Sequence, residues 1–99
     1  MDSVTLLQQL VSIPSINPSL EPSSRGEKEI ASFIADVCRQ ENLEVYLEEA
    51  APNRPNVIAI AKGSGGGKTL MLNAHMDTVG VARMLEPFEA RIEDNKLFG

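Results

Sequence analysis

Hydrophobic residues recur with a helical period at the start of the chain. The first helix is predicted to follow an N-cap at Asp2 or Ser3. It is predicted to end near Ser12, because Pro14 disfavours helical geometry in the residue before it. The apolar face of this helix has four members at helical spacing: Val4, Leu7, Leu10 and Val11. The proline-containing segment that follows is expected to be an ordered surface loop rather than a domain boundary.

A second amphipathic helix is predicted from about Ser24 to Glu41. Ser24 and Glu27 have the spacing of a capping box, in which each side chain binds a backbone N–H of the first turn. One stripe of this helix is apolar and faces away from its charged residues: Ile30, Phe33, Ile34, Val37 and Cys38. The lone cysteine is therefore expected to be a buried, inert thiol.

The rest of the chain has the shorter period and apolar runs that are typical of strands. Strands are predicted at 43–47 and 57–61, with a loop at 50–56, and a third strand is predicted from Thr69 to Met76. The glycine-rich segment before Thr69 suggests that the second and third strands form an antiparallel hairpin. Two fragments, 90–92 and 96–98, flank an Asp-Asn turn. Helices and strands together predict an α/β layer arrangement.

Composition restricts the class of partner and the compartment. The chain has 99 residues, enough for one small domain, and a formal net charge of −5. No basic patch is available to neutralise phosphates, so a nucleic-acid partner is not expected. No segment approaches the length of a membrane span, and no secretory signal is recognisable. The single cysteine then indicates a reducing compartment, and a cytoplasmic location is predicted.

The glycine-rich segment Gly63–Lys68 invites comparison with a phosphate-binding loop. That motif has four residues between its first glycine and Gly-Lys-Ser/Thr, and here the spacing from Gly63 is one residue short. The motif must also open a helix, whose N-terminal amides hold the anion, whereas an apolar run follows Lys68. A flexible turn is favoured, and a nucleotide site is rejected.

The strongest candidate for chemistry is the pair His75 and Asp77 at the end of the third predicted strand. Residues two apart in a strand share a face, so the carboxylate of Asp77 can accept a hydrogen bond from one imidazole nitrogen of His75. The other nitrogen is then free for a metal such as zinc. The alternative is a non-catalytic α/β binding or interaction module, in which His75 and Asp77 form only a structural pair.

The run Asn73–Val79 resembles the first metal-binding signature of the M20 zinc metallopeptidases and deacylases. This family includes acetylornithine deacetylase and succinyl-diaminopimelate desuccinylase. Further segments resemble the family in the same order along essentially the whole chain: Leu6–Val11 with Ile13-Pro14-Ser15 and Asn17-Pro18, Gly26-Glu27, Asn56–Ala59, Pro87-Phe88, and Asp94–Gly99. The stretch Val79–Ala82 is most similar to the acetylornithine-deacetylase-like branch.

The resemblance implies a fold, a reaction and a set of partners. The fold is the N-terminal part of a three-layer α/β/α zinc-peptidase-like catalytic domain with a mixed sheet. His75 would bind one of two zinc ions, for which cobalt or manganese can substitute, and Asp77 would be a catalytic-site residue that holds the imidazole. The reaction is hydrolysis of an amide bond in an N-acyl amino acid or small peptide, with zinc polarising the carbonyl. Full-length members dimerise through a lid domain, so a homodimer is the expected assembly.

The sequence departs from the family where its next motif, of the form Arg-Gly-x-x-Asp-Met-Lys, should follow Gly99. The bridging aspartate, the general base and the other metal ligands have no counterparts here. Residues 1–99 are therefore expected to be the N-terminal portion of the catalytic domain, without the remainder of that domain or the lid. A catalytic zinc site needs three protein ligands. The isolated chain is accordingly expected to be inactive, to bind zinc weakly, and to aggregate through exposed apolar surface.

Overall fold

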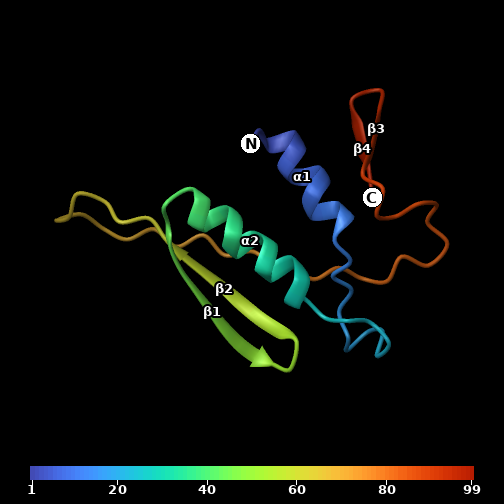
Figure 1. Ribbon diagram of the computed structural model, residues 1–99, viewed down its shortest axis with the longest axis horizontal. Coiled ribbons are helices and arrows are strands. Elements are labelled where there is room, and N and C mark those ends of the chain that lie inside the picture. Colours follow the sequence, from blue (N-terminus) through green and yellow to red (C-terminus); the bar gives the residue numbers. More distant parts are fainter.

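The computed structural model describes residues 1–99 and contains two helices in the first half of the chain (Figure 1). Helix α1 spans Ser3–Ser12, and the side chain of its N-cap Asp2 accepts a hydrogen bond from the backbone N–H of Thr5 at 2.9 Å. The predicted start and end of this helix are confirmed. Helix α2 spans Lys28–Gln40 and buries small and apolar side chains on one face: Ile30, Ala31 and Ala35.

The capping box predicted for α2 is wrong. The N-cap is Glu27, which makes no capping hydrogen bond with its side chain. Its carboxylate instead binds Arg54, 27 residues further along the chain. The hydroxyl of Ser24 donates to the backbone oxygen of Ile16. Both side chains were identified correctly as hydrogen-bonding groups, but tertiary partners took the place of the local backbone.

Strands β1 (Glu44–Ala51) and β2 (Arg54–Ile60) form an antiparallel hairpin. Both are longer than the sequence pattern predicts, and the predicted loop at 50–56 contracts to a tight turn in which Asn53 has a φ of 61°. Pro55 lies within β2, opposite Glu49. A two-stranded hairpin has only edge strands, and an edge can hold a proline that donates no hydrogen bond.

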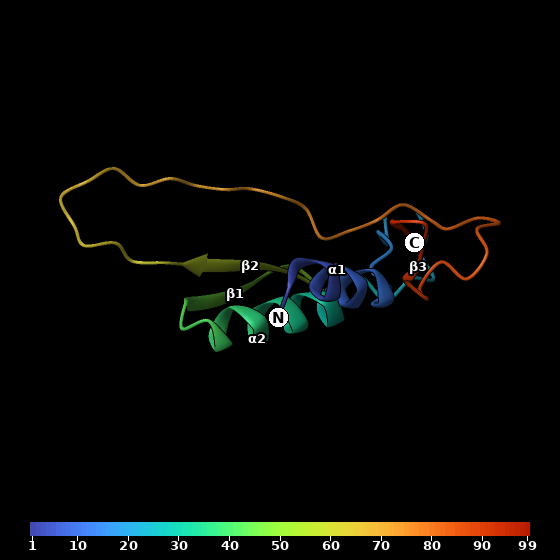
Figure 2. The same ribbon diagram turned by 90° about the horizontal axis from the view of Figure 1, so that it is seen from above.

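The strand predicted from Thr69 to Met76 and its hairpin with β2 are wrong. This segment is extended but pairs with no strand. Its expected partner, β2, pairs only with β1. Figure 2 shows it separated from β2. Three consecutive apolar residues in it are almost fully exposed to solvent: Leu70 (82%), Met71 (85%) and Leu72 (87%). An apolar run indicates that a segment favours burial, but a strand also needs a neighbour for its backbone hydrogen bonds.

The end of the chain forms a second, smaller hairpin. Strands β3 (Arg91–Glu93) and β4 (Lys96–Phe98) pair antiparallel, as predicted. Asp94 and Asn95 both have positive φ, at 50° and 59°. Two successive positive φ angles define the type I′ turn, whose twist matches that of the flanking strands.

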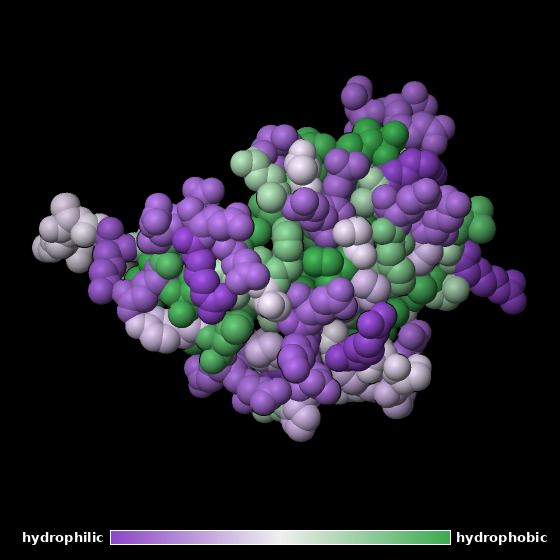
Figure 3. Space-filling model, in the orientation of Figure 1, coloured by the Kyte–Doolittle hydropathy of each residue, from purple (hydrophilic) through white to green (hydrophobic).

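The elements form a thin α/β arrangement rather than a closed core. Helix α2 packs on both strands of the β1–β2 hairpin, on the side opposite to the extended segment that follows β2 (Figure 2). Only seven of the 99 residues are buried, and hydrophobic residues appear at the surface of the helical face (Figure 3). The predicted α/β class is confirmed; both sheets are two-stranded and antiparallel. No helix has the length and apolar character needed to cross a bilayer.

Candidate functional site

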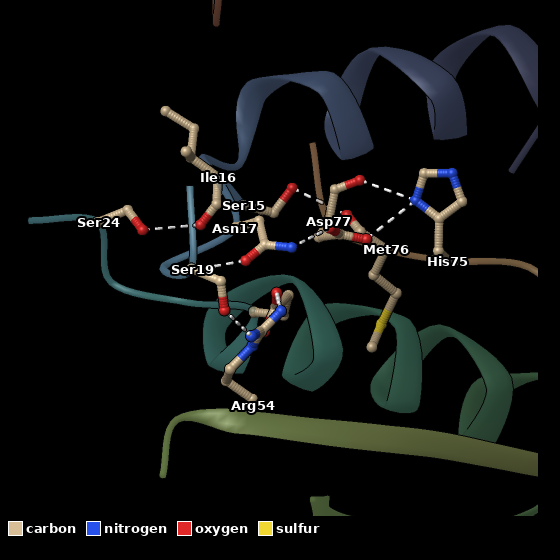
Figure 4. A network of polar contacts seen from close by, with 10 residues as sticks. Ser15, Ile16, Asn17, Ser19, Ser24, Arg54, His75, Met76 and Asp77 are labelled. Atoms are coloured by element: carbon tan, nitrogen blue, oxygen red, sulfur yellow. Dashed lines mark hydrogen bonds and ion pairs between the residues drawn. The ribbon is translucent and has the colours of Figure 1, made fainter. Parts of the chain in front are cut away.

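His75 and Asp77 are in direct contact. The Nδ1 atom of His75 lies 3.0 Å from Asp77 Oδ1 and 2.9 Å from the backbone oxygen of Asp77 (Figure 4). Since a backbone carbonyl oxygen can only accept, Nδ1 must be the protonated nitrogen in these contacts. The neutral ring then has its lone pair on Nε2. The His75 side chain is 85% exposed and that of Asp77 is 28% exposed, so the imidazole extends outward from a partly covered carboxylate.

The loop after α1 holds the segment that carries Asp77. Ile16 and Thr78 form an isolated parallel β-bridge, with the N–H of Asn17 donating to the Thr78 oxygen at 2.9 Å. The N–H of Thr78 donates in turn to the oxygen of Ser15, at 3.0 Å. The buried Ser15 hydroxyl also donates to the backbone oxygen of Met76, at 2.9 Å. The candidate site therefore depends on contacts between segments about 60 residues apart.

The Asp77 carboxylate has two side-chain partners. The Asn17 amide donates to Oδ2 at 2.9 Å, while His75 contacts Oδ1. The hydrogen bond from Asn17 is the main cause that lowers the pKa of Asp77 below its ordinary value, against the opposing effect of desolvation; His75 contributes further. Hydrogen bonds to the ionised form stabilise it. Asp77 is thus held as a carboxylate that can only accept.

A second polar cluster lies beside this network. The Arg54 guanidinium binds the Glu27 carboxylate through two hydrogen bonds, of 2.9 and 2.8 Å, and also donates to the Ser19 hydroxyl at 3.2 Å. The Glu27 side chain is 7% exposed and that of Arg54 is 29% exposed, so the carboxylate is largely removed from water while the guanidinium keeps partial contact with it. Two parallel hydrogen bonds between a guanidinium and a carboxylate restrict the relative orientation of the two groups. This pair fixes the start of α2 against the β1–β2 turn and against the loop that carries Asn17.

His75 and Asp77 border two hollows in the surface. One, of about 470 Å³, is mainly apolar and is lined by residues of α1, α2 and the segment 75–81. The other, of about 290 Å³, is more polar and includes Glu27 and Arg54 in its wall. The imidazole therefore stands where an apolar and a polar surface meet. A substrate with one apolar and one polar part suits such a position.

This chain has one side chain placed to serve as a metal ligand, the imidazole of His75. His75 Nε2 is accessible and unpaired by any other side chain. No group of three or more histidine, cysteine, aspartate or glutamate side chains is arranged to hold a metal ion. A catalytic zinc ion usually has three protein ligands. These residues alone do not make a metal centre.

Sequence reasoning identified His75 and Asp77, and the structure brings them into contact. It did not identify Ser15 or Asn17 as parts of the same network. The sequence signals for them were their place in the proline-containing loop and in the segments that resemble the family, and neither indicates a contact 60 residues away. Arg54 was also missed, because it lies in what the pattern predicted as a loop.

The chain is similar to known hydrolases. It is 32% identical, over 102 aligned positions, to the N-formyl-4-amino-5-aminomethyl-2-methylpyrimidine deformylase of Halalkalibacterium halodurans, an alignment that covers 97% of this chain and 23% of that protein. It is 28% identical over 105 positions to succinyl-diaminopimelate desuccinylases from two strains of Ehrlichia ruminantium, covering 100% of this chain and 26% of those proteins. The similarity is to hydrolases as a class. It does not single out one member.

The extent of these matches is limited. The chain spans about a quarter of the length of the curated relatives it matches. No protein-family model matches the chain. No solved structure matches it either.

Proposed function

We propose that residues 1–99 are the N-terminal portion of the catalytic, metal-binding domain of an M20-type zinc metallohydrolase. The observation that carries this proposal is the His75–Asp77 contact, which leaves Nε2 of an exposed imidazole free. It occurs in the stretch that resembles the metal-binding signature of that family, in a chain similar to two kinds of hydrolase. In this proposal the three-layer α/β/α domain with its mixed sheet is completed by polypeptide outside this chain.

His75 would supply one ligand to a zinc ion through Nε2, and Asp77 would fix the tautomer and orientation of the ring. The remaining ligands of the two metal ions and the general base would come from outside residues 1–99, and cobalt or manganese could replace zinc. When bound, the metal supplies Lewis-acid polarisation of a carbonyl group. The residues of this chain orient the imidazole and hold Asp77 ionised.

The proposed reaction is removal of an acyl group from nitrogen in an N-acyl amino acid or a small peptide. The names of the relatives support this class, since formyl and succinyl groups on nitrogen are both acyl groups. The junction of an apolar and a polar hollow at His75 is suited to a small molecule that has both characters. Homodimer formation and a cytoplasmic location stay predictions.

The proposal is tested in the complete protein by replacing His75 with alanine. We expect the loss of about one metal equivalent per chain and of nearly all hydrolysis of N-formyl, N-acetyl and N-succinyl amines. Asp77→Asn keeps the shape of the side chain but removes its charge, and changes to a residue that hydrogen-bonds a metal-binding histidine cost roughly 10–100-fold in activity or metal affinity. Metal content is measured by atomic emission and turnover by release of the free amine.

Thr69→Ala is the matched control, because Thr69 lies exposed in the same extended segment and has no part in the polar network. It should retain both metal and turnover. If His75→Ala also retains both, the proposal is overturned. The pair would then be structural, as expected for a non-catalytic binding module.

A further inference from the structure

Asn17 forms hydrogen bonds within the chain through both ends of its side-chain amide and through its backbone N–H. Its side-chain oxygen accepts from the backbone N–H of Ser19 at 2.8 Å, and its side-chain nitrogen donates to Asp77 Oδ2 at 2.9 Å. Its own backbone N–H donates to the oxygen of Thr78 at 2.9 Å. The Ser19 N–H can only donate, so it determines which end of the amide is oxygen. The nitrogen must then face Asp77.

This orientation has a consequence for the Asp77 carboxylate. With Oδ2 bound to Asn17, the other oxygen, Oδ1, is directed at Nδ1 of His75 (Figure 4). The backbone bridge between Ile16 and Thr78 keeps the loop and the Asp77 segment at a fixed distance. The amide, the carboxylate and the imidazole therefore form one line of contacts that ends at the exposed ring.

We propose that Asn17 is a positioning residue for His75: by holding Oδ2 of Asp77, it directs Oδ1 to the Nδ1–H of His75 as a second acceptor beside the Asp77 backbone oxygen, and so strengthens the preference for an unprotonated, outward Nε2. Asn17 touches neither the ring nor a substrate and acts only through Asp77. The effect on the tautomer of His75 is independent of any reaction. Its effect on hydrolysis rests on the function proposed above.

A simpler role for Asn17 is the local turn alone. An asparagine whose side chain accepts from the N–H two residues on forms an Asx turn, a frequent loop structure. The two roles use different ends of the same amide, so they can be separated by substitution. Asn17→Asp retains an oxygen for the Ser19 N–H but has no donor for Asp77. Asn17→Ala removes both.

The test is ¹⁵N NMR of the imidazole in the complete protein after removal of bound metal with a chelator, because a metal on Nε2 would itself keep the proton on Nδ1. Spectra are recorded at a pH where the ring is neutral, with the His75 signals assigned by their loss in His75→Gln. In the parent protein we expect the Nδ1–H tautomer to predominate. Asn17→Asp and Asn17→Ala should both raise the fraction of the Nε2–H tautomer, because the Asp77 backbone oxygen is then the only fixed acceptor at Nδ1. Ser19→Ala removes the hydroxyl that contacts Arg54 but keeps the backbone N–H, so it should leave the tautomer unchanged.

An unchanged tautomer in Asn17→Asp would overturn the proposal and leave the turn as the only role. Thermal unfolding is measured alongside, and Asn17→Ser replaces Asn17→Asp if the latter does not fold, since a hydroxyl can also form this turn. Turnover provides an independent measurement: kcat should fall roughly tenfold in Asn17→Asp with little change in KM, the lower end of the range for residues that support a metal ligand through hydrogen bonds. A shifted tautomer without any hydrolase activity in the parent protein would refute the proposed function but not the positioning role.

Discussion

Two aspartates in this chain are held ionised by groups that donate hydrogen bonds to them. At Asp77 the main donor is the side chain of Asn17, and at Asp2 it is the backbone N–H of Thr5. In both cases the pKa of the carboxyl lies below its ordinary value of 3.8. Asp77 belongs to the candidate site, whereas Asp2 only begins a helix. Asp2 therefore offers a test of this effect that does not involve the site.

The N-terminus of α1 should lose stability in acid. A carboxyl group whose pKa is lower in the folded than in the unfolded protein stabilises the folded state at pH values above the unfolded pKa. This stabilisation is lost as the pH falls through the folded pKa. Protection of the first-turn amides of α1 against hydrogen exchange should accordingly decline below about pH 4. Asp2→Asn retains a capping side chain that does not titrate. Its protection should not show this decline, and an identical decline in both proteins would contradict the prediction.

At the scale of elements, one glycine allows the start of α2 to approach the β1–β2 turn closely. Gly26 has a φ of +76°, and a Cβ atom there would lie 2.5 Å from the backbone oxygen of Asn53 in the β1–β2 turn. The N–H of Glu27 donates to that same oxygen at 3.0 Å. Helix and hairpin therefore approach each other through backbone atoms, at a place where a side chain does not fit.

Gly26→Ala should destabilise the protein. The left-handed conformation alone costs a residue with a Cβ atom roughly 1–2 kcal/mol, and displacement of the turn adds to this. Gly63→Ala is the matched control, because Gly63 has no positive φ and no atom within 4 Å of the added methyl group. The control should be neutral or stabilising by up to about 1 kcal/mol. Chemical denaturation measures both, and equal stability of the two variants would show that the close contact at Gly26 is unimportant.

Local signals predicted the elements whose determinants are themselves local. The α1 cap at Asp2 and the turn at Asp94-Asn95 depend on neighbours within four residues, and both predictions are confirmed. The N-terminus of α2 could not be read in this way, because Glu27 binds Arg54 rather than its own helix. His75 and Asp77 were found because two residues on one extended segment need no long-range contact to meet. Asn17 was not, because its partner lies 60 residues away.

At the scale of the whole molecule, apolar surface is the main feature. The exposed side chains of Leu70, Met71 and Leu72 lie on an extended segment whose backbone pairs with no strand. Unpaired backbone groups beside exposed apolar side chains favour strand pairing between chains. The sequence could indicate that this run favours burial, but not which element would cover it.

The polypeptide of residues 1–99 alone should self-associate through this segment. Replacing Leu70 and Leu72 together by lysine adds charge to an unpaired edge and should raise the monomer fraction at least severalfold in sedimentation velocity runs. Lysines at Ser64 and Thr69 add the same charge at exposed polar positions nearby and should have a much smaller effect. Equal effects of the two pairs would point to net charge, rather than the apolar segment, as the cause of association.

The parallel bridge between Ile16 and Thr78 affects the order in which the molecule folds. The contacts beside it join residues 60 and 61 positions apart, so they close a loop that contains all of α2 and the β1–β2 hairpin. Closing such a loop has a high entropic cost unless the intervening elements have already become compact. We infer that the helices and the hairpin form first and the His75 environment last. The orientation of the imidazole would thus report that folding of this chain is complete.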